Sequence, residues 1–167
     1  VISNELDIKT GLSIIKFENG VLFNNYVHAS KLVGYFGWEN VPEDIINPEL
    51  IIPNYNSGKK GIEGNSVEGQ GLEQLGYKKG TIIKAAGSIL YHQPTWQNNY
   101  YEVLVKWNRM PSNKIIGQWT ISNNKPAILP DIQSSLKEPT YWPSHIQWWK
   151  DYWSRSSVTL PDKQLEK

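Results

Sequence analysis

The sequence predicts a mainly β fold, an antiparallel β-sandwich followed by one aromatic-rich C-terminal linker helix. Three observations indicate this class. Apolar and polar residues alternate with a period of two in several short segments, as in strands with one buried face. Turn residues such as Asn19-Gly20 separate these segments at hairpin spacing. Near the C-terminus, aromatic residues recur instead at helical spacing.

Residues 1–29 predict a β-meander. Leucine and isoleucine alternate with other residues on both sides of Thr10-Gly11, which predicts a tight hairpin. Asn19-Gly20 between two apolar runs is the strongest hairpin signal in the chain. Strands are then expected over 21–29 and 31–38, so the spacing favours an antiparallel sheet over βαβ units.

The segment 39–70 differs from the preceding residues in composition, because it is rich in proline and glycine. Its prolines and glycines oppose regular strand ladders, so it is expected to be a long irregular loop. Loops of this length in compact domains are often functional, but they are also often mobile, and both interpretations stay open. The glycines of 64–71 lack the strand and the lysine that a phosphate-binding loop needs.

Four further strands are predicted over 80–86, 88–92, 100–107 and 115–122. The alternation over 100–107 is the cleanest in the chain, with Glu102 and Lys106 on the face expected to be exposed. The opposite face is apolar and comprises Tyr101, Val103, Val105 and Trp107. Residues 123–126 then close the sheet.

The C-terminal part predicts a helix that begins at Ser144 as its N-cap, directly after Pro143. Ile146, Trp149 and Trp153 fall on one stripe of this helix, which needs a large surface to pack against. Asp162 resembles the N-cap of another helix that barely begins, which predicts that the chain is a fragment. We therefore expect a β-sandwich module over 1–126. A linker over 127–167 would lead toward a helical domain.

Composition excludes several classes of function. The net charge is only +1, so neither nucleic acid nor a membrane surface is an expected partner. The chain has no cysteine, and His28, His92 and His145 are scattered, so no metal and no cofactor is expected. The N-terminus does not resemble a signal peptide. A signal for secretion would therefore lie upstream.

Glycoside hydrolysis requires two carboxyl groups that flank the scissile bond. Glu68, Glu73 and Glu102 are the candidates, but nothing in the sequence brings two of them together. We therefore assign no catalytic residue, and Glu102 is expected to be a solvated residue on a strand face.

The densest polar and aromatic cluster spans 91–100, at a strand end and across a turn. Amide and imidazole groups beside an exposed aromatic ring suit a sugar, which offers hydroxyl groups and a flat apolar face. The substrate-binding candidates are Tyr91, His92, Gln93 and Trp96. The alternative is an ordinary turn in which Trp96 folds back on the core.

The segment 145–166 resembles the connector of large bacterial glycoside hydrolases with an (α/α)6 barrel. It carries the paired tryptophans 148–149, then Tyr152-Trp153, Arg155-Ser156 and Pro161-Asp162 of that pattern. Residues 26–36, 48–53 and 90–93 resemble the preceding sandwich, and the nearest comparison is glycoside hydrolase family 95, the fucosidase-like enzymes.

The resemblance implies a supersandwich, here lacking its front strands, that packs on a helical barrel holding the catalytic carboxylates. It also implies a periplasmic or extracellular location, a glycan substrate and a barrel domain of the same protein as partners. Three hypotheses follow: a non-catalytic part of a glycoside hydrolase, a free-standing carbohydrate-binding or lectin-like module, and a structural interaction domain.

Overall fold

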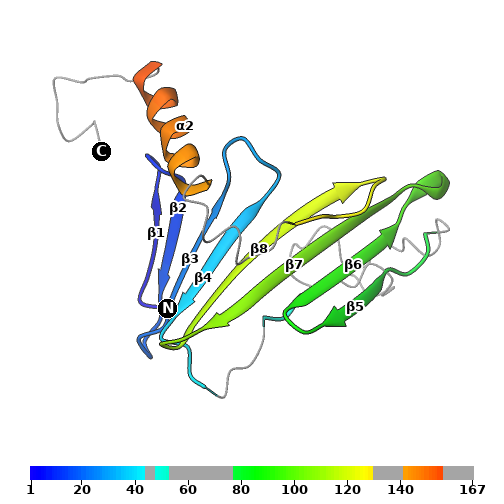
Figure 1. The fold of residues 1–167 in the computed structure, drawn as a ribbon, viewed down its shortest axis with the longest axis horizontal. Coiled ribbons are helices and arrows are strands. Elements are labelled where there is room, and N and C mark those ends of the chain that lie inside the picture. The colour runs from blue at the N-terminus through cyan, green and yellow to red at the C-terminus, as the bar shows by residue number, and fades with distance from the viewer. Residues whose placement is uncertain (44–47, 53–76, 130–140, 156–167) are drawn as a thin grey trace, which may run out of the picture.

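The computed structural model describes residues 1–43, 48–52, 77–129 and 141–155. Within them, eight strands and one α-helix form (Figure 1). The first four strands are β1 (Ser3–Asp7), β2 (Leu12–Lys16), β3 (Leu22–Val27) and β4 (Gly34–Glu39). The other strands are β5 (Thr81–Ala85), β6 (Ser88–Pro94), β7 (Tyr100–Met110) and β8 (Lys114–Asn123), and the helix is α2 (Tyr141–Arg155).

The strands form one antiparallel sheet in the order β1-β2-β3-β4-β8-β7-β6-β5. Two meanders, one before and one after the long connection, therefore meet along β4 and β8, where Trp38 pairs with Ile115. The sheet is open, with β1 and β5 at its edges (Figure 1). The predicted mainly β, antiparallel fold is confirmed, whereas the described residues form a single sheet and show no second layer of a sandwich.

The predicted hairpins lie where their turn residues place them. Gly11 and Gly20 both have positive φ, +65° and +80°, between β1, β2 and β3. The Asn19 side chain accepts the Val21 N–H at 3.2 Å and helps to close its turn. The later strands lie at their predicted positions, but β6 continues to Pro94, beyond the predicted 92, and β7 continues to Met110, beyond the predicted 107.

The sheet has two faces, which we call the front face and the back face. The front face carries Phe23, Trp38, Ile115, Val105 and Ile89 from neighbouring strands. Val41 and Leu50, from the chain after β4, pack on these side chains and complete a small apolar core. The core thus lies on the front face, at the junction of the two meanders.

Two glycines let aromatic rings lie flat on this junction. A Cβ on Gly34 would stand 2.1 Å from the Trp119 ring, and one on Gly117 would stand 2.0 Å from Phe36. Both contacts are far below van der Waals distance, so only glycine fits at either position. The rings cover the backbone where a side chain would otherwise be, which pins the register of β4 against β8.

The back face corrects one prediction, because Glu102 is not a solvated residue. Its side chain is only 13% exposed. The segment after β8 crosses this face, where Glu102 accepts the Ala127 N–H at 2.8 Å and Lys106 donates to the Leu129 carbonyl at 3.3 Å. The chain therefore covers a strand face that its alternation alone marks as exposed.

The helix α2 confirms the predicted aromatic helix but corrects its start. It begins at Tyr141, so Ser144 lies inside the helix and is not the N-cap. Pro143 is compatible with the first turn, because the N–H groups there have no partner within the helix. The Ser144 hydroxyl lies 3.1 Å from His28 Nε2 instead and joins the helix to the sheet. The expected helix start at Asp162 lies outside the described residues.

His145 holds α2 on the sheet and is completely buried. Its Nδ1 accepts the Ala29 N–H at 3.1 Å, so Nε2 carries the proton that is donated to the Thr10 carbonyl at 2.6 Å. The ring also packs on Tyr26, and burial raises the pKa of Tyr26 to about 12. One histidine therefore joins three segments that are far apart in sequence.

The predicted aromatic stripe of α2 faces the turn between β1 and β2. Trp153 donates from Nε1 to the Ile8 carbonyl at 3.1 Å, and the Trp149 ring lies over Gly11. Trp148 and Tyr152, beside this stripe, are substantially exposed, whereas the partly exposed Trp142 ring packs edge-on against Tyr26 of β3 with centroids 4.9 Å apart. None of the helices in the described ranges combines the length and apolar character needed to cross a membrane.

Candidate functional site

The candidate site is built on the turn between β6 and β7, which is preorganised by its backbone. Gln97 and Asn98 adopt left-handed conformations with φ of 56° and 63°. Thr95 N–H donates to the Asn99 carbonyl at 2.7 Å, and the Asn99 side chain donates to the Trp96 carbonyl at 2.8 Å. Asparagine tolerates left-handed backbone better than most residues, which suits it to this turn.

Asn124, directly after β8, fixes the turn to the sheet. Its side-chain oxygen accepts the Tyr100 N–H at 2.8 Å, and its amide nitrogen donates to Asn99 Oδ1 at 2.8 Å. The backbone N–H of Asn124 also donates to the Tyr100 carbonyl at 2.9 Å. Three hydrogen bonds from one residue therefore hold the turn in place.

A hollow of about 400 Å³ opens beside this turn, and we call it the turn hollow. Trp96 lies at its border with 61% of its surface exposed, so it does not fold back on the core. The hollow combines aromatic rings, side-chain amides, hydroxyl groups and two basic groups. Its lining comprises Tyr77, Lys78, His92, Pro94, Thr95, Trp96, Gln97, Asn98, Asn99 and Tyr100.

His92 is oriented by two neighbours. Its Nδ1 lies 3.0 Å from Glu102 Oε1, and its ring stacks on Tyr100 with centroids 4.8 Å apart. The Ala127 N–H, and after it the His92 ring, hold the pKa of Glu102 below its ordinary value. Glu102 thus remains an anion that accepts from Nδ1–H and directs the other ring nitrogen elsewhere.

The four residues that the sequence nominates do not all meet in the hollow. His92 and Trp96 line it, but Tyr91 and Gln93 lie buried on the front face, because successive residues of a strand point to opposite faces. The Tyr91 hydroxyl donates to the Gln93 side chain, and Gln93 donates to the Lys78 carbonyl at 2.9 Å. These two residues therefore position the chain at Lys78 and do not contact the hollow.

Most of the other lining residues belong to the cluster 91–100 but were not nominated, Tyr100 among them, whereas Tyr77 and Lys78 lie outside that cluster. A period-two reading of 88–94 places His92 on the face opposite Tyr91 and Gln93. Pairing across the turn then brings His92 opposite Glu102 and Pro94 opposite Tyr100. The alternation was thus sufficient to find Tyr100. No local signal marks Lys78, because the Gln93 hydrogen bond places it.

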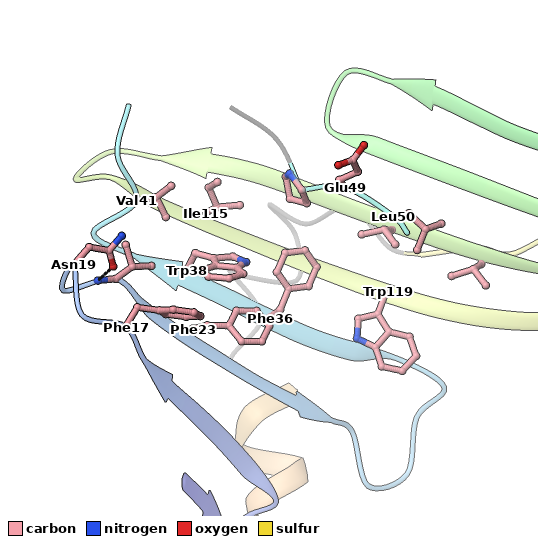
Figure 2. A pocket seen from close by; sticks show the side chains of 14 residues that line it. Phe17, Asn19, Phe23, Phe36, Trp38, Val41, Glu49, Leu50, Ile115 and Trp119 are labelled. Carbon is pink, nitrogen blue, oxygen red and sulfur yellow. Dashed lines mark hydrogen bonds between the residues drawn. The ribbon is translucent and has the colours of Figure 1, made fainter. Parts of the chain in front are cut away.

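The front face carries a larger groove of about 720 Å³, which we call the front groove (Figure 2). Phe17, Phe23 and Trp38 lie side by side in it, with centroid distances to Trp38 of 5.9 Å and 4.3 Å. Asn19 and Glu49 are its only polar lining side chains among the described residues, and Asn19 is already hydrogen-bonded to Val21. The groove therefore suits an apolar partner better than a sugar.

The described residues offer neither a metal site nor a pair of carboxylates at the turn hollow. It contains no group of three or more histidine, aspartate or glutamate residues that could hold a metal ion. Glu68 and Glu73 lie outside the described residues, and Glu102 is occupied on both oxygens by His92 and Ala127. The turn hollow itself is lined by no carboxylate among the described residues.

Comparison with known proteins adds no assignment: no protein-family model matches the chain, and no curated protein matches it.

Proposed function

We propose that this chain is a non-catalytic β-sheet module of a carbohydrate-active enzyme that contacts a glycan through the turn hollow. The observation that carries the proposal is the exposed Trp96 ring beside amide, hydroxyl and imidazole groups. A flat ring packs on the C–H face of a sugar, while fixed polar groups around it accept from and donate to hydroxyl groups. A rigid turn reduces the entropy lost on binding.

The module itself would not hydrolyse the glycan. A glycosidase needs two carboxyl groups about 5–10 Å apart across the bond that it cleaves. Glu102, which contacts the lining residue His92, is held by the Ala127 N–H and by His92 and is largely buried. The carboxylates that cleave the glycan would belong to a helical domain of the same protein.

Two apolar surfaces that the described residues leave exposed support a place inside a larger protein. We propose that a second sheet covers the front groove as the other layer of a sandwich, because the groove is lined almost entirely by apolar side chains. The exposed Trp148 and Tyr152 of α2 would pack against the helical domain. Such an enzyme would act in the periplasm or outside the cell.

The proposed glycan contact is tested by replacing Trp96 with alanine. Binding of a panel of oligosaccharides to the 167-residue chain is measured by calorimetry. Loss of a central aromatic contact costs about 2 kcal/mol or more, which is about 30-fold in Kd. Trp148→Ala is the matched control, because Trp148 is also exposed but lies on α2. Equal affinities of both variants and the parent chain would reject the turn hollow as the binding surface.

A free-standing carbohydrate-binding module is the second candidate. It is favoured by one observation: the turn hollow is completed by a single hairpin, the chain at Tyr77–Lys78 and Asn124. An apolar dye separates the two candidates. If the front groove is covered within a larger enzyme, the isolated chain binds the dye and the product of the complete reading frame does not. Equal dye binding by both would favour the free-standing module.

A further inference from the structure

The charges of the residues that line the turn hollow indicate which class of sugar it would bind. Two basic residues, Lys78 and His92, line it together with neutral polar and aromatic residues. No carboxylate is among its described lining residues. Glu102 contacts the lining residue His92 from behind: its Oε2 accepts the Ala127 N–H at 2.8 Å, and its Oε1 lies 3.0 Å from His92 Nδ1. The hollow therefore presents basic and neutral groups to a ligand.

We infer that the turn hollow selects an acidic saccharide, a chain containing uronic acid, with the sugar carboxylate paired to Lys78 and a sugar ring stacked on Trp96. This inference rests on the proposed glycan contact and adds the substrate class. A lysine ammonium is a mobile point charge with three donors, which suits a carboxylate whose position varies along a polymer.

Lys78 is held at the hollow from the opposite side of the sheet. Gln93, which is buried on the front face, donates from one amide nitrogen to the carbonyl groups of Lys78 at 2.9 Å and Pro94 at 2.8 Å. Pro94 borders the hollow at the end of β6. Gln93 thus ties the chain that bears the ammonium group to the strand that bears His92, and it is a positioning residue.

His92 serves the same ligand through its second nitrogen. Because Nδ1 is directed at Glu102, Nε2 is the nitrogen left for a ligand, and it makes no hydrogen bond within the described residues. A protonated ring donates from Nε2 to a carboxylate, whereas a neutral ring accepts from a sugar hydroxyl. Either form of the His92 ring can bind a uronic acid. The positive charge of Lys78 makes the site prefer a uronic acid to a neutral sugar.

The test uses uronic acid oligosaccharides and the same oligosaccharides after chemical reduction of their carboxyl groups. The two sets share linkage and length and differ only in charge. Galacturonate, glucuronate, mannuronate and guluronate oligomers are titrated into the 167-residue chain. At least one acidic oligomer is expected to bind about tenfold more tightly than its reduced form. Added salt is expected to remove most of this difference.

The matched variants are Lys78→Gln and Lys79→Gln. The two lysines are neighbours, both are exposed and both lose one charge, but only Lys78 lines the turn hollow. Lys78→Gln is expected to weaken acidic oligomers about tenfold and to spare the reduced ones, whereas Lys79→Gln leaves both unchanged.

Three outcomes would overturn the inference. Equal binding of acidic and reduced oligomers that is sensitive to Trp96→Ala would remove the acidic class and keep the glycan contact. Equal effects of Lys78→Gln and Lys79→Gln on the acidic oligomers would remove Lys78 as the carboxylate partner. Binding of neither set would reject the proposed function, and the inference with it.

Discussion

Replacement of Gly11 by alanine tests how closely α2 packs on the turn between β1 and β2. Gly11 has φ of +65°, and a Cβ there would meet Trp149 ring atoms at 3.1–3.2 Å. The left-handed conformation costs an alanine about 1–2 kcal/mol. Forcing a methyl group into a packed contact adds about 1–3 kcal/mol, because the ring and the helix must shift.

Gly20→Ala is the matched control. Gly20 has φ of +80° in the neighbouring turn, but a Cβ there would meet nothing within 4 Å. Gly20→Ala therefore loses only the free energy that a left-handed backbone costs an alanine. Both variants are unfolded in urea with tryptophan fluorescence as the readout. Gly11→Ala should lose about 1–3 kcal/mol more unfolding free energy than Gly20→Ala, with a Tm lower by roughly 2–4 °C for each kcal/mol. Equal losses would refute the packing of Trp149 on this turn.

Two other replacements test the contacts of α2 and of Glu102. His145→Ala should cost about 2–4 kcal/mol of unfolding free energy in the same urea assay, because it removes a fully buried ring and leaves a partly buried Ala29 N–H and Thr10 carbonyl without their partner. A loss below about 0.5 kcal/mol would show that the helix does not depend on this ring. Glu102 has a lowered pKa, with the Ala127 N–H as its main cause, so its contribution to stability is present above the ordinary glutamate value of 4.5 and is lost as pH falls through the folded value. Glu102→Gln should therefore flatten the acid limb of a plot of stability against pH. An unchanged acid limb would contradict this role.

The strand series could be read from the sequence because each hairpin carries its own local signal. Asn19-Gly20 and Thr10-Gly11 both provide a glycine with positive φ where the chain reverses. Side-chain alternation then fixes which residues share a face, as in β7. The joining of β4 to β8 has no such signal. It depends on Gly34 and Gly117 accepting the Trp119 and Phe36 rings, which is a contact between distant segments.

The candidate site was predictable in part. The cluster around Trp96 was visible in the sequence, and the ring is exposed as a binding residue requires. The assignment of Tyr91 and Gln93 to the same surface as His92 overlooked the period of the strand. Lys78 and Glu102 belong to other segments, and hydrogen bonds to Gln93 and Ala127 bring them into position. Only tertiary structure reveals such pairings.

The helix start shows the limit of capping rules. Ser144 follows a proline and has the residue type of an N-cap, yet α2 already begins at Tyr141. Its hydroxyl lies 3.1 Å from His28 Nε2 and links the helix to the sheet. A local rule assigns a polar side chain to its nearest N–H groups, whereas here packing of the helix on the sheet offered another partner.

Glycan binding at the turn hollow is tested most sharply by the affinity of the chain for oligosaccharides with Trp96 intact and with Trp96 replaced by alanine. If the turn hollow binds the glycan, the parent chain and Trp148→Ala bind alike, whereas Trp96→Ala binds about 30-fold more weakly, with an unchanged urea midpoint. Oligosaccharide binding that survives in Trp96→Ala would contradict the claim that the turn hollow is the glycan-binding surface.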